Sequence, residues 1–329
     1  MNILSEASFT QKQIYWWSAT FLLWVAFGLM AYAMYEWQHN KAYHKDMFKG
    51  FIPMFMGNVG FVVAYLPYHT YNAFSSAIEG ESFQIAEGGG ICYIGTFFNN
   101  VFMCYSWFGM TMVAYALHET VRRAMKSMNR GKIMTRNVLL GSFVLPLILT
   151  VGYFFVDFDN IGPYRGLYCL WTFWHGPNFG YGIVWWGINL IFLAFFYYNT
   201  YKMLHGHFAK MGDTVANNAG KATLNNMIIL SIKFVGIFVA CGSPVLLEIV
   251  WAVAGGSPPV QLSMLGGLTL KLKCALDPLV ILTMPAIKDE RSAVRKATLD
   301  RLTLTNDGTG ENSTSGRISK KTGPASSTV

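Results

Sequence analysis

Two lysines and an aspartate lie close together in the last long apolar stretch of the chain, residues 259–285. They are Lys271, Lys273 and Asp277, and Pro278 follows directly. An ammonium at the centre of a bilayer-spanning segment costs at least about 2.5–3.5 kcal/mol on insertion scales, so such a residue is a candidate for a functional site by default. A lysine amine forms a Schiff base with an aldehyde, and a desolvated lysine is the more nucleophilic one. Each of the two lysines therefore needs a partner or a function.

The spacing along a helix separates the two lysines. Residues four apart meet on one helix face, so Lys273 can pair with Asp277. Lys271 lies about 200° around the helix from Lys273, given ~3.6 residues per turn, and it has no obvious partner in its own segment. The structural alternative for Lys271 is a salt bridge to another helix, with Glu248 as the candidate. A non-covalent contact with a ligand or an ion is the other alternative.

The composition predicts that these residues are positioned by membrane-spanning helices. Of the 329 residues, 53% are hydrophobic and only 13% are charged, whereas a soluble domain carries about 25% charged residues. Apolar runs of roughly 20 residues can cross a hydrocarbon core of ~30 Å. The sequence therefore predicts an all-α membrane protein, with a seven-transmembrane helix bundle over residues 15–287. Its seven runs are residues 15–37, 51–74, 91–117, 138–158, 179–203, 226–252 and 259–285.

The net charge of +8 is distributed in a way that favours a lipid bilayer, not a nucleic acid, as the partner. Lysines and arginines gather in alternate loops, and such loops face the cytoplasm. We therefore expect residues 1–14 outside the cell, the C-terminus inside, and a multi-pass protein of the plasma membrane. The first run is too long for the core of a cleaved signal peptide and is expected to stay as a helix. The basic segments are residues 41–49, 122–136, 202–221 and 288–296.

The segment after the last run divides in two. Residues 288–305 alternate charged and apolar side chains, which predicts a short amphipathic helix on the inner membrane surface. Residues 306–329 are rich in Gly, Ser and Thr and are expected to be disordered. This tail offers phosphorylation sites for an arrestin-like partner, and its last residues, Ser327-Thr328-Val329, fit a PDZ domain.

Two cysteines fall on the expected outer face, where disulfides persist. Cys92 opens the third run and Cys169 lies in the outer loop before the fifth. We expect them to form a bridge that holds this loop across the mouth of the bundle. The alternative is a pair of free thiols at apolar positions.

Seven spans with this cysteine pair resemble the rhodopsin-like G-protein-coupled receptors, and two internal motifs add to the resemblance. Phe238-Val-Ala-Cys-Gly-Ser-Pro244 is similar to the family's Phe-x-x-Cys-Trp-x-Pro, with Gly242 in place of the tryptophan. Asp277-Pro278-Leu-Val-Ile281 is similar to Asn-Pro-x-x-Tyr, with isoleucine in place of the tyrosine. A proline inside a span removes a backbone hydrogen bond and bends the helix. The resemblance implies a switch made by Phe238, Pro244, Asp277 and Pro278.

Within this family, animal-type opsins carry their retinal lysine six residues before the Asn or Asp of the last motif, where this chain has Lys271. The resemblance therefore implies retinal as the cofactor, bound through a Schiff base at Lys271. The aromatic residues expected to line its pocket are Tyr105, Trp107, Trp185, Trp186 and Phe238.

The chain departs from the opsin pattern at the counterion. Gly95 and Pro163 stand where opsins place the acid that pairs with the protonated Schiff base. Without a counterion the Schiff base would lose its proton and absorb in the ultraviolet. The other candidate counterions are Glu248, Asp157, Asp159 and Glu87.

The chain also departs from the family pattern at the expected inner end of the third run. The resemblance implies a heterotrimeric G protein as the partner, and the family's coupling motif lies at this end. His118-Glu119-Thr120 lies where the family has Asp/Glu-Arg-Tyr, and Arg122 is the first arginine. In addition, no acid lies between Cys92 and Leu117, so a light-driven pump is not expected.

The sequence as a whole predicts a receptor, not an enzyme, and an opsin-like photoreceptor that signals by movement of the sixth helix. Two alternatives stay open. One is a chemosensory receptor of the same fold with a diffusible ligand, and the other is a seven-span transporter or membrane enzyme with Lys271 in a polar network. No metal site is expected.

Overall fold

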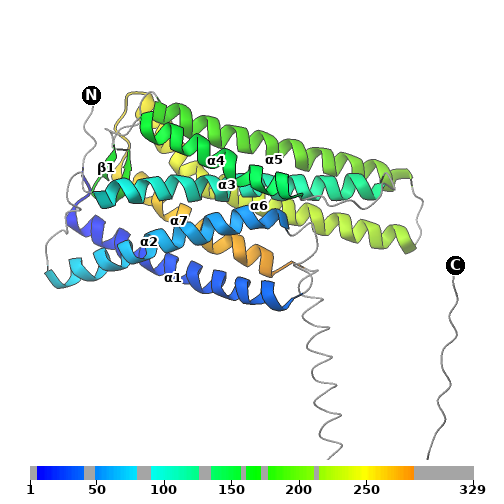
Figure 1. Ribbon diagram of the computed structural model, residues 1–329, viewed down its shortest axis with the longest axis horizontal. Helices are drawn as coiled ribbons and strands as arrows, with labels where there is room; N and C mark the ends of the chain where they lie inside the picture. Colours follow the sequence, from blue (N-terminus) through cyan, green and yellow to red (C-terminus); the bar gives the residue numbers. More distant parts are fainter. Residues whose placement is uncertain are drawn as a thin grey trace, which may run out of the picture. The chain divides into compact units, whose positions relative to one another are not determined.

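The structure, a computed structural model, describes residues 6–40, 49–79, 90–125, 135–156, 161–171, 177–210 and 215–284. This part of the chain consists of seven α-helices and one two-stranded hairpin, and the helices run side by side (Figure 1). The predicted helical class is confirmed, and each of the seven apolar runs coincides with one helix. The elements are α1 (Phe9–His39), α2 (Phe51–Glu79), α3 (Gly90–Met125), α4 (Arg136–Val156), β1 (Ile161–Tyr164), β2 (Tyr168–Trp171), α5 (Pro177–Lys210), α6 (Val215–Val253) and α7 (Val260–Leu282).

Several predicted features lie outside the described residues. They are the amphipathic helix over residues 288–305, the tail over residues 306–329, and the candidate counterions Glu87, Asp157 and Asp159.

The first helix begins earlier than the apolar run that predicted it. The Oγ of Ser8 accepts from the backbone N–H of Gln11, and the side chain of Gln11 accepts from the backbone N–H of Ser8. This reciprocal capping box satisfies two of the free N–H groups at a helix start. The helix therefore begins before the predicted boundary between residues 14 and 15, because the polar residues before the run cap the helix and form its first turn.

Three helices of the described part are long and apolar enough to cross a membrane: Phe9–His39, Phe51–Ala77 and Ile232–Val253. Many of their outward side chains are large and apolar, among them Phe21, Trp24 and Ile232. An exposed apolar surface of this kind suits contact with lipid. The chain thus contains helices that can lie in a bilayer.

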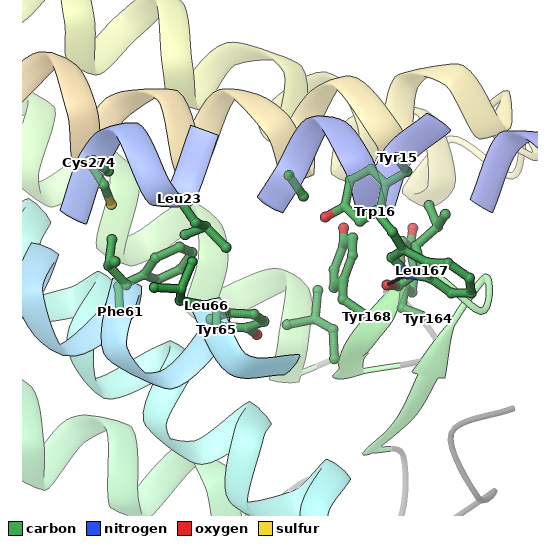
Figure 2. Packing of buried hydrophobic residues seen from close by; sticks show 14 of the residues in the cluster. Tyr15, Trp16, Leu23, Phe61, Tyr65, Leu66, Tyr164, Leu167, Tyr168 and Cys274 are labelled. Atoms are coloured by element: carbon green, nitrogen blue, oxygen red, sulfur yellow. Dashed lines mark hydrogen bonds between the residues drawn. The ribbon is translucent and has the colours of Figure 1, made fainter. Parts of the chain in front are cut away.

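The buried side chains form two main clusters. One joins α1, α2, α7 and the hairpin, and Figure 2 shows Tyr15 and Trp16 of α1 beside Tyr164, Leu167 and Tyr168 of the hairpin. The indole Nε1 of Trp16 donates to the carbonyl of Leu167 at 3.1 Å, which ties the hairpin to α1. The other cluster joins α2, α3, α5, α6 and α7, with Phe51, Trp107, Leu193, Phe238 and Val280 among its members.

The predicted disulfide is present and anchors the hairpin to the start of α3. Cys92 and Cys169 are bonded, with their Cα atoms 5.3 Å apart, and Pro163 is the register partner of Cys169 across the hairpin. The turn runs through Arg165 and Gly166, both at positive φ (54° and 71°). Glycine adopts this region freely, but a non-glycine residue does so only where the surroundings hold it. Arg165 is held because its buried guanidinium donates to the Pro258 carbonyl at 2.6 Å.

The close contact between α2 and α3 depends on glycine. A Cβ at Gly57 would overlap the backbone of Ser106 and the carbonyl of Phe102. We expect Gly57→Ala to lower the free energy of unfolding by about 1–3 kcal/mol, because overpacking forces the two backbones apart. Denaturation in sodium dodecyl sulfate, followed by circular dichroism, measures this change.

The matched control is Gly28→Ala in α1, where an added Cβ meets nothing within 4 Å. This variant should be as stable as the wild type or slightly more stable, because alanine is the better helix former. Equal effects of the two substitutions would contradict the tight α2–α3 contact.

Candidate functional site

Lys271 is buried, with 3% of its surface exposed, and it is held by neutral groups. Its Nζ donates to the hydroxyl of Tyr15 at 2.7 Å and to the carbonyl of Gly267 at 3.0 Å. The ammonium also lies 5.0 Å from the ring centroid of Tyr15 and 5.6 Å from those of Tyr65 and Tyr168. Cations at such distances are attracted to the faces of aromatic rings. The amine is thus stabilised without a carboxylate among the described residues.

A histidine completes this group of side chains, which we call the Lys271 cage: Tyr15, Tyr65, His69 and Tyr168. The imidazole of His69 stacks on Tyr65, with centroids 5.5 Å apart, and meets the ring of Tyr15 edge-on at 5.6 Å. The cage is built by α1, α2, β2 and α7, and Figure 2 shows Tyr15, Tyr65 and Tyr168 converging from three of these elements. In the hairpin, burial raises the pKa of Tyr168, so its hydroxyl stays protonated.

Gly267 explains why Lys271 turns toward α1. Gly267 lies one helical turn before Lys271 on α7, and a Cβ there would come within 2.5 Å of the Tyr15 hydroxyl. A glycine at this position lets Tyr15 approach α7 closely enough to accept a hydrogen bond from Lys271.

Glu248, the predicted partner or counterion of Lys271, is engaged elsewhere. Its Oε1 accepts from the hydroxyl of Tyr164 at 2.6 Å and from the hydroxyl of Ser263, and Arg165 Nε lies 4.0 Å away. Among the described residues, no carboxylate forms an ion pair with Lys271. The salt bridge between Lys271 and Glu248, the structural alternative drawn from the sequence, is therefore absent from the described part, where Glu248 accepts from the hairpin and from α7.

The pairing predicted for Lys273 is confirmed, and it belongs to a larger buried centre. Lys273 Nζ lies 2.6 Å from Asp277 Oδ2 and 2.6 Å from the hydroxyl of Ser106. Asn58 Nδ2 donates to the same aspartate oxygen at 2.9 Å, and the Ser106 hydroxyl donates to Asn58 Oδ1 at 2.6 Å. This centre joins α2, α3 and α7 next to Pro278, at the residues where the resemblance implies a switch.

The aromatic residues predicted to line the pocket of Lys271 do not face it. Phe238 stacks on Trp186, with centroids 5.7 Å apart, and meets Trp107 edge-on at 6.1 Å. These three rings belong to the cluster around α3, α5 and α6, whereas the cage belongs to the cluster around α1, α2 and the hairpin. Lys271 points toward α1, so none of these three rings is among its contacts, and their place in a retinal pocket stays a prediction. A Cβ at Gly242 would meet the indole of Trp186, so Trp186 fills the space beside this glycine.

The other two residues predicted to line the pocket are Tyr105 and Trp185. Tyr105 of α3 packs edge-on against Phe143 of α4 at 5.2 Å, away from the cage. Trp185 belongs to α5, and its side chain lies outside the described part of the structure.

The cage residues themselves were missed from the sequence. His69 gave a weak signal, since it is an imidazole inside an apolar run, one helical turn after Tyr65. Tyr168 adjoins Cys169, so the predicted disulfide already placed it near the mouth of the bundle. Nothing in the sequence distinguishes Tyr15 from the other aromatic residues of the first run.

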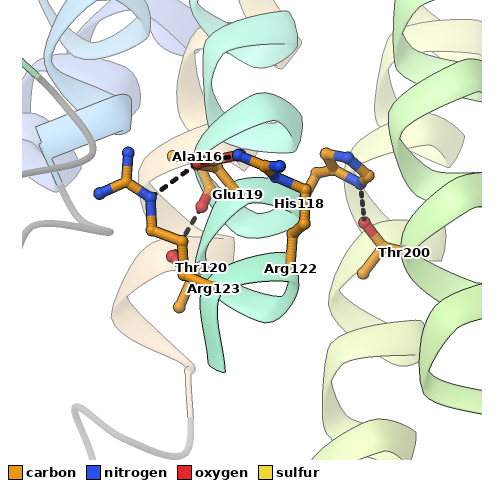
Figure 3. A network of polar contacts seen from close by, with 7 residues as sticks. All are labelled: Ala116, His118, Glu119, Thr120, Arg122, Arg123 and Thr200. Carbon is orange, nitrogen blue, oxygen red and sulfur yellow. Dashed lines mark hydrogen bonds and ion pairs between the residues drawn. The ribbon is translucent and has the colours of Figure 1, made fainter. Parts of the chain in front are cut away.

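A second polar network lies near the C-terminal end of α3 (Figure 3). Glu119 accepts from Arg122 at 2.7 and 2.8 Å and from Arg123 at 2.7 Å. The hydrogen bond from Arg122 and the positive charges lower the pKa of Glu119 to about 2. His118 contacts the hydroxyl of Thr200 at 3.3 Å and so links α3 to α5.

Comparisons add no family to this description: no family model matches the chain, and no curated protein matches it. Among the described residues there is no cluster of three or more His, Cys, Asp or Glu side chains that could hold a metal ion. The Lys271 cage and the buried Lys273–Asp277 centre are the described features that bear on function.

Proposed function

We propose that this protein is a seven-span membrane receptor with its N-terminus outside, and that Lys271 binds retinal as a Schiff base. One observation carries the proposal: Lys271 is a buried amine whose described partners are a phenol, a carbonyl and three aromatic rings. A lysine amine in such surroundings is available to an aldehyde once it loses its proton. The rings of Tyr15, Tyr65 and Tyr168 fit a conjugated chain attached at this position.

Retinal would supply light absorption and a change of shape, and the chain's own residues would transmit that change. Lys271 and Lys273 lie two residues apart on α7, so a movement of Lys271 acts directly on the helix that holds the Lys273–Asp277 pair. Pro244 and Pro278 interrupt the backbone hydrogen bonds of α6 and α7, which lets the inner halves of these helices move. We propose that this movement exposes basic inner loops to a G protein at the plasma membrane. The tail would serve arrestin-like or PDZ partners.

The absorption spectrum of the purified protein with retinal tests the proposal. We expect a band in the near ultraviolet, because no described carboxylate pairs with Lys271 to keep a Schiff base protonated. Lys271→Ala should abolish the band, since it removes the nitrogen that is proposed to form the bond. Absence of any band in the wild type would sink the photoreceptor proposal.

The matched control is Lys233→Ala, which removes an exposed lysine of α6 and should leave the band unchanged. A band that persists in Lys271→Ala, or that is lost in Lys233→Ala, would place the attachment elsewhere.

The same site favours a second candidate function, a chemosensory receptor for a diffusible carboxylate ligand. The ammonium of Lys271 has no carboxylate partner among the described residues, and a ligand carboxylate would complete an ion pair in a low-dielectric site. Ligand-dependent nucleotide exchange on a G protein in darkness, lost in Lys271→Ala, would favour this candidate over the photoreceptor.

A further inference from the structure

We propose that His69 is the proton acceptor that activates Lys271 toward an aldehyde. This inference rests on the proposed function, and it adds a reactive role for a residue of the cage. A protonated amine cannot attack a carbonyl, so Schiff-base formation at a buried lysine needs a base close to the ammonium.

The geometry singles out His69 among the described groups. It is fully buried, and neither Nδ1 nor Nε2 has a hydrogen-bond partner in the part of the chain that the structure describes. Buried polar atoms in native proteins are almost always paired, so an unpaired imidazole calls for an explanation. His69 contacts the rings of Tyr15 and Tyr65, and both of these rings face the Lys271 ammonium. The base, His69, and the acid, the Lys271 ammonium, thus both contact the rings of Tyr15 and Tyr65.

The other bases near Lys271 are already engaged. Glu248 accepts from Tyr164 and Ser263, and Asp277 is paired with Lys273 and Asn58. The phenols of Tyr15 and Tyr168 are weak bases and serve as neutral contacts. Of the groups described here, the imidazole of His69 has the suitable chemistry, since a neutral imidazole has a ring nitrogen whose lone pair can accept a proton.

Other buried polar groups lie on α2 after His69 and on α3. Asn72 Oδ1 and Ser75 Oγ of α2, and Thr96 Oγ1 and Asn99 Oδ1 of α3, have no hydrogen-bond partner among the described residues. Buried polar atoms of this kind can be satisfied by internal water. We propose that they also accept the water released by condensation.

The reaction balances with His69 as a carrier of one proton. The Lys271 ammonium gives a proton to His69, and the free amine nitrogen forms a bond to the aldehyde carbon. The carbonyl oxygen takes a proton from the attacking nitrogen and the stored proton from His69, and it leaves as water. The nitrogen then forms a double bond to carbon and carries the positive charge. One ammonium and one aldehyde thus become one protonated Schiff base and one water, and His69 is regenerated. Because no described carboxylate pairs with this nitrogen, the Schiff base then releases its proton to water, which gives the neutral form expected to absorb in the near ultraviolet.

The test follows imine formation with a small aldehyde, propanal, so that it does not depend on retinal. The full-length protein is mixed with propanal, samples are quenched with borohydride, and mass spectrometry of the Lys271 peptide gives the modified fraction against time. His69→Phe keeps a ring in the cage and removes the base. We expect it to slow the approach to equilibrium about 100-fold, in the range typical of general acid–base catalysis, and to leave the final modified fraction unchanged. The exposed Lys233 should react at one rate in every sample.

Two further variants separate proton transfer from packing. His69→Gln keeps a polar side chain but cannot accept the proton, so it should be as slow as His69→Phe; it also carries the test if the phenylalanine variant fails to fold. His205→Phe replaces an exposed histidine of α5 and should react like the wild type.

Any one of four results would overturn the inference. They are an unchanged rate in His69→Phe, a rate restored by His69→Gln, a lower final modified fraction at an unchanged rate, and no modification of Lys271 in the wild type. If retinal gives no absorption band while propanal shows the expected loss of rate, the photoreceptor proposal fails and the role of His69 stands.

Discussion

Replacing Lys273 by methionine is expected to lower the free energy of unfolding by about 3–5 kcal/mol, the range found when one partner of a buried ion pair is removed. Lys273 is 3% exposed and Asp277 is fully buried, so the substitution leaves a carboxylate in a low-dielectric interior, where Asn58 is its remaining side-chain donor among the described residues. Denaturation of purified protein in sodium dodecyl sulfate gives the change relative to the wild type.

Two further variants define the origin of this effect. Replacing both partners, Lys273→Met with Asp277→Leu, should recover a large part of the loss, because a buried ion pair and an apolar pair of similar volume differ little in stability. Lys233→Met removes an exposed lysine and should change the stability by less than about 0.5 kcal/mol. If the single and the double variants lose the same amount, the ion pair is not what holds α7 to α2 and α3.

Removing the disulfide is expected to lower the free energy of unfolding by about 2–4 kcal/mol, the typical range for such a cross-link. Cys92 and Cys169 are 77 residues apart in sequence, so the bond closes a long loop. It also fixes the hairpin that brings Tyr168 to Lys271 and Tyr164 to Glu248. Replacing both cysteines by serine should therefore also weaken any absorption band formed with retinal.

The reducing agent dithiothreitol serves as the matched control for the disulfide. It should lower the stability of the wild type toward that of the double serine variant and leave the variant itself unchanged. A wild type that is insensitive to reduction, although its thiols become free, would contradict a stabilising role of the bond.

The sequence predicted features that depend on local spacing. Seven apolar runs predicted seven helices because such runs have few polar positions to place in water. The four-residue spacing of Lys273 and Asp277 predicted their pairing, and the outward position of Cys92 and Cys169 predicted their bond. The helices and the Lys273–Asp277 pair depend on residues that are close in the sequence. The disulfide was predicted because both cysteines were expected on the oxidising side of a membrane.

The cage around Lys271 could not be predicted in this way. Tyr15 and Lys271 are 256 residues apart in sequence, and their contact depends on how α1 is rotated against α7. A helix that is apolar on all sides gives little periodic signal for its inward face. The sequence therefore placed Lys271 within a helix but assigned it the rings of Phe238 and Trp186, which belong to the neighbouring cluster. Gly267 permits the close approach of Tyr15, and this role could not be predicted because it depends on how α1 packs against α7.

The site of covalent attachment is the most direct test that Lys271 binds retinal. The purified protein is incubated with retinal, reduced with borohydride and digested, and the peptides are analysed by mass spectrometry. We expect a retinyl group on the peptide that contains Lys271, located on Lys271 and not on Lys273, which is held by Asp277 and Ser106. Folded protein with no retinyl group on Lys271, or with label spread over exposed lysines such as Lys233, would contradict the proposed function.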